Sequence, residues 1–268
     1  MPGRPARRSA MRLLVPREYG AYGQLLLPLS ASLLLGRPGL PAWGLATAAV
    51  GGFLAHEGLA VLFGRRGPRA LREQGPAAFG SAGFFGGAGA VAGVAAFVRA
   101  PPDAQQAALV TLLLAAAAMA AAWVGHERTA AGETLAAVAL SSWSVPVALA
   151  GGVAPTVAAT CGVAWALSFS AASLVVRAII ARTLRRAFGR QLAAGVVLGA
   201  APVPVALWLG RIGAVPAGTG LALLPTCVLV VALAGLGLHA RHLRRVGWSI
   251  VAAAVMTVLA MVTAMPRS

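Results

Sequence analysis

The 268-residue chain contains no lysine, a single aspartate and only five glutamates. Charged residues make up 10% of the sequence, whereas soluble domains carry about 25%. Hydrophobic residues make up 59% of the chain, and the mean hydropathy is +0.82. This scarcity of charge excludes an ordinary soluble protein and leaves no stretch long enough for a separate soluble domain.

Cysteine is also scarce, which argues against a disulfide-stabilised protein and against a cysteine-ligated metal protein. The two cysteines, Cys161 and Cys227, both lie in apolar segments. They are interpreted as small packing residues and not as a disulfide or a metal site. No HExxH motif or comparable metal-binding cluster is present. We therefore predict no metal site and no cofactor.

Nine apolar segments fill nearly the whole sequence. Each is close to the ~20 residues that a helix needs to cross a bilayer. They are too long for membrane β-strands and lack the alternation of such strands. The sequence thus predicts an all-α fold, a polytopic membrane helix bundle of about nine transmembrane helices, with a basic flexible tail (1–15) and one transmembrane domain (16–268). The segments are 19–36, 41–64, 77–98, 105–125, 134–152, 154–180, 191–210, 215–238 and 246–265.

The arginines are distributed unevenly among the gaps between these segments. Eighteen of the 22 basic residues lie near the N-terminus or in and beside every second gap, within 4–17, 65–72, 128, 177–190 and 241–245. The positive-inside rule then places the N-terminus in the cytoplasm and the C-terminus outside. Arginine-rich, alanine-rich usage is typical of a high-GC bacterial genome, so we expect a multi-pass protein of the bacterial inner (cytoplasmic) membrane.

The net charge of +16 is not interpreted as a sign of nucleic-acid binding. The arginines lie next to the apolar segments, where orientation and anionic lipid headgroups account for them. The expected partners are membrane lipids, and a lipid-like ligand is compatible with this charge. The sequence does not identify a protein partner.

Local signals in the second and third segments predict two structural details. Two pairs of glycines four residues apart, Gly83 with Gly87 and Gly89 with Gly93, favour close helix approach. The gap between these segments begins and ends with helix breakers, and its middle, 69–74, is predicted to form a short interfacial helix.

The reactive side chains follow the arginines, since all four histidines and five of the six acids lie on the predicted cytoplasmic side. His56 and Glu57 lie about 10 Å inside the expected boundary, at ~1.5 Å per residue, where ionisable groups are costly. They are the candidate catalytic residues, acting as acid or base. The alternative is a buried pair of Glu57 with an arginine that only fixes helix packing.

Arg177 is the most unusual arginine, because it lies within an apolar run. Its position makes a partner such as Glu57 or Glu133 attractive, and guanidinium forks also suit phosphate and carboxylate. Each of these residue types also has a purely structural explanation. An acid can stabilise the N-terminus of a helix, a tyrosine can belong to the aromatic belt at the membrane interface, and an arginine can snorkel to the lipid headgroups. The predicted ligand-binding residues are Glu18, Tyr19, Tyr22, Glu133, Arg65, Arg66, Arg177 and Arg182.

Three functions remain open from these residues. The first is a cytoplasm-facing polar cavity that binds an anionic amphiphile, such as an isoprenoid or a lipid phosphate. The second is transport of a small solute, although the outer half offers few polar groups for a pathway. The third is a non-catalytic partner or assembly factor of a membrane complex.

Several motifs resemble the YwiC-like family of bacterial membrane proteins. They are 16–22 (PREYGAY) with 25–28 (LLLP), 56–57 (HE), 62–67 (LFGRRG), 127–133 and 245–248 (RVGW). Tyr19 stands where the family pattern has histidine. The nine-span architecture is also similar to that of UbiA-type prenyltransferases, whose magnesium is held by aspartate-rich loops. The corresponding loops here have no aspartate, and Asp103 is on the other side, so magnesium is not expected.

Overall fold

The computed structural model describes residues 13–16 and 18–266, which form helices and no strands. Within this part of the chain, nine helical segments fall at the nine predicted apolar segments, which confirms the all-α fold class. They are α1 (Tyr19–Leu35), α2 (Leu40–Leu62), α3–η1–α4 (Gly67–Phe97), α5 (Pro102–Trp123), α6–α7 (Ala130–Ala150), α8 (Pro155–Thr183), α9–α10 (Gly189–Arg211), α11 (Thr219–Gly235) and η2–α12 (Ala240–Ala264).

Seven of these segments are long and apolar enough to cross a membrane. The other two, α1 and α11, have 17 residues each, or about 25 Å of helix against a hydrocarbon core of ~30 Å. The protein is therefore a multi-pass integral membrane protein.

Contacts between Cα atoms group the described residues into two compact units. Unit 1 contains residues 13–16 and Thr47–Val94, and unit 2 contains Glu18–Ala46 with the chain after Val94. The predicted division into a basic tail (1–15) and one transmembrane domain (16–268) stays a prediction, and residues 1–12 and 17 lie outside the described part.

In unit 1, α2 packs closely against the long helix Gly67–Phe97. A Cβ on Gly51 would lie 2.7 Å from the carbonyl oxygen of Phe85 and 2.9 Å from the Cα of Gly89. A Cβ on Gly58 would lie 2.7 Å from the carbonyl oxygen of Ala78. The expected small-residue contact is thus confirmed for the pair Gly89 and Gly93. It is wrong for Gly83 and Gly87, which have open space around them.

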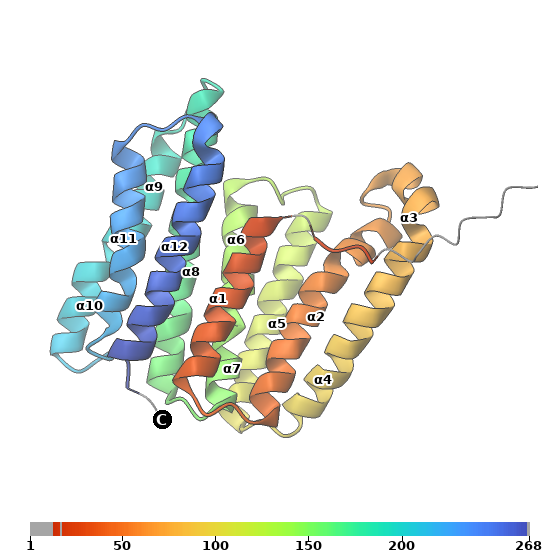
Figure 1. Cartoon of the computed structure of the whole chain (residues 1–268), viewed down its shortest axis with the longest axis horizontal. Helices are drawn as coiled ribbons and strands as arrows, with labels where there is room; N and C mark the ends of the chain where they lie inside the picture. The colour runs from red at the N-terminus through yellow and green to blue at the C-terminus, as the bar shows by residue number, and fades with distance from the viewer. Residues whose placement is uncertain (1–12, 17, 267–268) are drawn as a thin grey trace, which may run out of the picture. The chain divides into compact units, whose positions relative to one another are not determined.

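The long helix differs from its prediction in two ways. The expected separate helix at 69–74 is wrong, because α3 (Gly67–Ser81) continues through η1 into α4 without a break (Figure 1). Its 31 residues span about 46 Å, so its polar first turns extend beyond a hydrocarbon core of ~30 Å. The second difference is η1 (Ala82–Gly86), a single π-helical turn.

Helix α8 is the centre of unit 2. It contacts α1, α6, α7, α9, α11 and α12, and more than half of its apolar window is buried. The side chain of Trp165 is buried and stacks on Phe169 with 5.4 Å between ring centroids. Met261 of α12 belongs to the same buried cluster. The interior of unit 2 is therefore apolar around this helix.

Hydroxyl groups stabilise a break between α6 (Ala130–Ser142) and α7 (Ser144–Ala150). The hydroxyl of Ser32 donates to the carbonyl of Ser144 at 2.8 Å, and that of Thr111 donates to the carbonyl of Ser142 at 3.3 Å. Pro146 has no N–H to donate to the carbonyl of Ser142, four residues earlier. Thr111 of α5 supplies this missing donor, and Ser32 of α1 adds a second hydrogen bond at the break.

The loops of unit 2 gather at two opposite ends (Figure 1). One end holds Glu18 with the connections 124–129, 184–188 and 236–239, and we call it the arginine-rich end. The other holds the remaining connections, where the amide of Arg37 donates to the carbonyl of Gly151 at 2.8 Å. Within unit 2, the arginines therefore concentrate at one end, as the alternating gaps predict.

Candidate functional site

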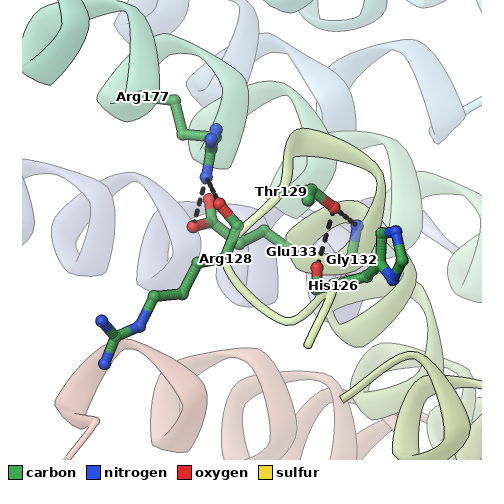
Figure 2. A network of polar contacts seen from close by, with 6 residues as sticks. All are labelled: His126, Arg128, Thr129, Gly132, Glu133 and Arg177. Atoms are coloured by element: carbon green, nitrogen blue, oxygen red, sulfur yellow. Dashed lines mark hydrogen bonds and ion pairs between the residues drawn. The ribbon is translucent and has the colours of Figure 1, made fainter. Parts of the chain in front are cut away.

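A salt bridge between Arg177 and Glu133 joins two helices at the arginine-rich end of unit 2. The Nη1 group of Arg177, on α8, donates to Oε1 of Glu133 at 2.6 Å and to the carbonyl oxygen of Arg128 at 2.8 Å. Figure 2 shows both bonds reaching one guanidinium group. Arg177 therefore ties both the first turn of α6 and the preceding loop to α8.

The loop before α6 is shaped by its own backbone and by Thr129. The Thr129 hydroxyl accepts from the amide of Gly132 at 3.0 Å and donates to the carbonyl of His126 at 2.8 Å (Figure 2). This is helix N-capping, which satisfies an amide left free at the start of a helix. A Cβ on Gly132 would overlap the carbonyl oxygen of His126. A residue larger than glycine would therefore not fit at position 132, and this tight turn sets the position of the next residue, Glu133.

The pair lies towards the end of α8 and not at its middle. Arg177 is 22 residues after the first residue of α8, which corresponds to about 33 Å along the helix. The side chains of Arg177 and Glu133 are 24% and 37% exposed. The Nε of Arg177 is nevertheless buried without a hydrogen-bond partner. Of the two partners predicted for Arg177, Glu133 is the one observed.

Three other predicted ligand-binding residues lie at the same end, two of them in α1 and one just before it. Glu18 immediately precedes α1, which packs against α6. Tyr19 is 88% exposed, and Tyr22 is half-buried one turn later. The structure thus brings Glu18, Glu133 and Arg177 to adjoining helix ends.

Arg182 lies five residues beyond Arg177 on α8 and is exposed. Its guanidinium carbon is 5.8 Å from the centroid of the Phe188 ring. The same guanidinium packs on the backbone at Gly237, where a Cβ would approach within 2.7 Å of Nη1. Arg182 therefore faces the connections beyond α8, not the Glu133 carboxylate.

The candidate catalytic residues belong to unit 1. Arg66 donates from Nε to Oε1 of Glu57 at 2.9 Å and from Nη2 to Oε2 at 2.6 Å, a bidentate pair. The side chains are 20% exposed for Glu57 and 41% for Arg66. His56 precedes Glu57 and is half-buried, as is Arg65. Glu57 thus pairs with an arginine, as the alternative foresaw, but the pair is partly exposed and its arginine lies in the turn that directly follows α2.

No group of three or more histidine, cysteine or acidic residues that could hold a metal ion occurs among the described residues. Sequence reasoning missed two parts of the site, the carbonyl of Arg128 and the cap at Thr129. A threonine before an apolar run is a known helix-start signal and could have identified the cap. The carbonyl contact depends on the fold and has no sequence signal.

The helices, the polar ends and the paired charges define a multi-pass helical membrane protein. The sequence model of the YwiC-like protein family matches residues 15–149, from before α1 to the end of α7. The chain belongs to this family. The matched part contains Glu18, Glu57 and Glu133, whereas Arg177 lies beyond it. Comparisons with curated proteins and with solved structures give no match.

Proposed function

We propose that this membrane protein binds the anionic head of an amphiphile, such as an isoprenoid or lipid phosphate, at the arginine-rich end of unit 2. The observation that carries the proposal is the placement of Arg177, which is anchored by two oxygen acceptors while its Nε has none. A guanidinium held in this way is preorganised for a further anionic oxygen.

The neighbouring residues suit the two parts of such a ligand. Arg177, whose side chain is 24% exposed, can contact the phosphate-bearing head. Exposed Tyr19 and half-buried Tyr22 at the start of α1 offer aromatic surface at the depth where aromatic side chains favour the membrane interface. We assign no chemical step to His56 and Glu57, since the carboxylate of Glu57 is already paired with Arg66.

The experiment is the recovery of bound lipid from purified protein. The wild type and the variants Arg177→Gln, Glu133→Gln and Arg211→Gln are purified in a mild detergent, and co-purified lipids are identified by mass spectrometry. We expect an anionic amphiphile on the wild type, a several-fold loss with Arg177→Gln, and retention with Arg211→Gln, which removes an exposed arginine at the opposite end of unit 2. Equal lipid content in all four proteins would contradict the proposal.

The proposal includes an orientation in the bacterial inner membrane, with the arginine-rich end of unit 2 in the cytoplasm. With Cys161 and Cys227 replaced by alanine, single cysteines are placed at Arg128 and at Gly152, which lie at opposite ends of unit 2. A membrane-impermeant maleimide applied to intact cells should label the cysteine at 152 and reach that at 128 only after permeabilisation. The reverse pattern would refute the orientation.

A second candidate is a non-catalytic partner of a membrane complex. It is favoured by one observation, that Glu57 and Glu133 are each already paired with an arginine of the same unit. Such pairs can act purely as links between elements of the fold. A stoichiometric protein partner in mild-detergent purifications, together with the absence of bound anionic lipid, would favour this candidate.

A further inference from the structure

The connections after α8 and after α11 are joined into one surface. The hydroxyl of Thr183 accepts from the amide of Ala240 at 2.9 Å while it donates to the carbonyl of Ile179. The guanidinium of Arg182 packs on Gly237, whose φ of +59° favours glycine. Two connections more than fifty residues apart in sequence are thereby held side by side at the arginine-rich end (Figure 1).

This surface is basic and has no acidic neighbours in its own part of the sequence. We call it the loop-pair surface and define it by the exposed residues Arg182, Arg185, Arg186, Arg241, Arg244 and Arg245. No aspartate or glutamate occurs anywhere in residues 134–268. Among the described residues, none of these six guanidinium groups forms an ion pair.

Several of these arginines occupy positions where an arginine is unfavourable for the stability of the fold. Arg185 has φ +53° just after the end of α8, a position where a helix end usually has glycine because a side chain is strained there. Arg244 and Arg245 lie in the first turn of α12, where the helix dipole disfavours cations. Their clustering also adds repulsion between like charges. An anion bound between the two connections would offset the two electrostatic effects.

We infer that the loop-pair surface binds the phosphate headgroup of an anionic phospholipid from the surrounding bilayer. The arginines lie at the end of α8, at the start of α12 and in the adjoining connections, which places them at headgroup depth. A soluble anion would compete there with a far higher local density of lipid phosphates. Planar guanidinium groups match phosphate oxygens in bidentate fashion. This inference is independent of the proposed function, because it involves neither Arg177 nor Glu133.

The test measures lipid selectivity. The protein is reconstituted in vesicles of equal parts phosphatidylglycerol and phosphatidylcholine, re-extracted, and examined by native mass spectrometry for bound lipid. The wild type should retain phosphatidylglycerol in preference to phosphatidylcholine. Each arginine removed should lower this preference by about fivefold, the equivalent of the ~1 kcal/mol that an arginine near an anionic surface contributes.

Three variants separate binding from folding. The double variant Arg241→Gln/Arg244→Gln and the single variant Arg185→Gly should both lose the preference, whereas Arg211→Gln should keep it. Arg185→Gly should have an equal or higher thermal midpoint, because glycine relieves the positive φ. A lower midpoint for Arg185→Gly would assign that side chain to the fold and overturn its role.

Two further results would overturn the inference as a whole. One is a preference for phosphatidylglycerol that is unchanged in both loop-pair variants, or reduced equally in Arg211→Gln, since the attraction would then not be located at this surface. The other is displacement of phosphatidylglycerol by millimolar inorganic phosphate, which would identify a soluble anion as the ligand. Neither result depends on the lipid recovered through Arg177, so the two proposals can fail separately.

Discussion

Replacing Gly51 by leucine should prevent the packing of α2 against the long helix within unit 1. Even the Cβ would lie 2.7 Å from the carbonyl oxygen of Phe85 and 2.9 Å from the Cα of Gly89. Overpacking usually costs about 1–3 kcal/mol. The atoms in the way here are backbone, which cannot rotate aside, so we expect a loss of about 3 kcal/mol or more. The measurement is the yield of monodisperse protein and its thermal midpoint in detergent.

The matched control is Gly52→Leu, one residue further along the same helix. A Cβ on Gly52 meets nothing within 4 Å, and the residue is exposed. Leucine is also the better helix former, by somewhat less than ~1 kcal/mol. The midpoint of Gly52→Leu should therefore equal or exceed that of the wild type. If both variants lose the same amount, the close contact at Gly51 is not what stabilises unit 1.

Arg177→Gln should be the most destabilising substitution of a charged residue in unit 2. It leaves the Glu133 carboxylate and the Arg128 carbonyl without their common donor. Removing one partner of a fully buried pair costs about 3–5 kcal/mol. Since these side chains are 24% and 37% exposed, solvent screening reduces the expected cost to about 1–3 kcal/mol. The measurement is thermal or denaturant unfolding in detergent.

A double-mutant cycle isolates the pair itself. Glu133→Gln combined with Arg177→Gln should cost less than the sum of the two single variants, with a coupling of about 1 kcal/mol or more. Additive losses would show that the two side chains do not stabilise one another. Glu57→Gln in unit 1 offers a comparison, because its partner Arg66 is 41% exposed and such pairs contribute about 1 kcal/mol or less.

The helical segments were predictable because a bilayer sets both their length and their composition. All nine apolar segments coincide with helices in the described residues, and none required knowledge of packing. The break at Trp143 does have a sequence signal, because Pro146 lies three residues later and has no N–H to continue the helix. The π turn at Ala82–Gly86 was not predictable in this way, because it does not change the hydropathy of its segment.

The sequence predicted which residues belong to the candidate site better than it predicted which of them pair with one another. Apolar surroundings identified Arg177 as needing an acceptor, but the choice of Glu133 depends on how α6 packs against α8. Glu57 could be expected to pair with an arginine, yet Arg66 lies past the end of α2, where the turn 63–66 brings it back. The short interfacial helix was wrong because flanking glycines and prolines did not end α3, whose Pro68 lies in its first turn and whose Pro76 lies within it.

The π turn sets the rotational phase of the long helix. Ala78 and Gly93 both contact α2 and are fifteen residues apart, whereas four α-helical turns take only about 14.4 residues. An uninterrupted α-helix would therefore rotate one contact away from the other by about 60°. One wider turn, closed by bonds to the fifth residue, absorbs most of this excess. The stretch Ala82–Gly86 thus acts as a register correction that keeps both halves of the helix facing the same glycine-lined neighbour.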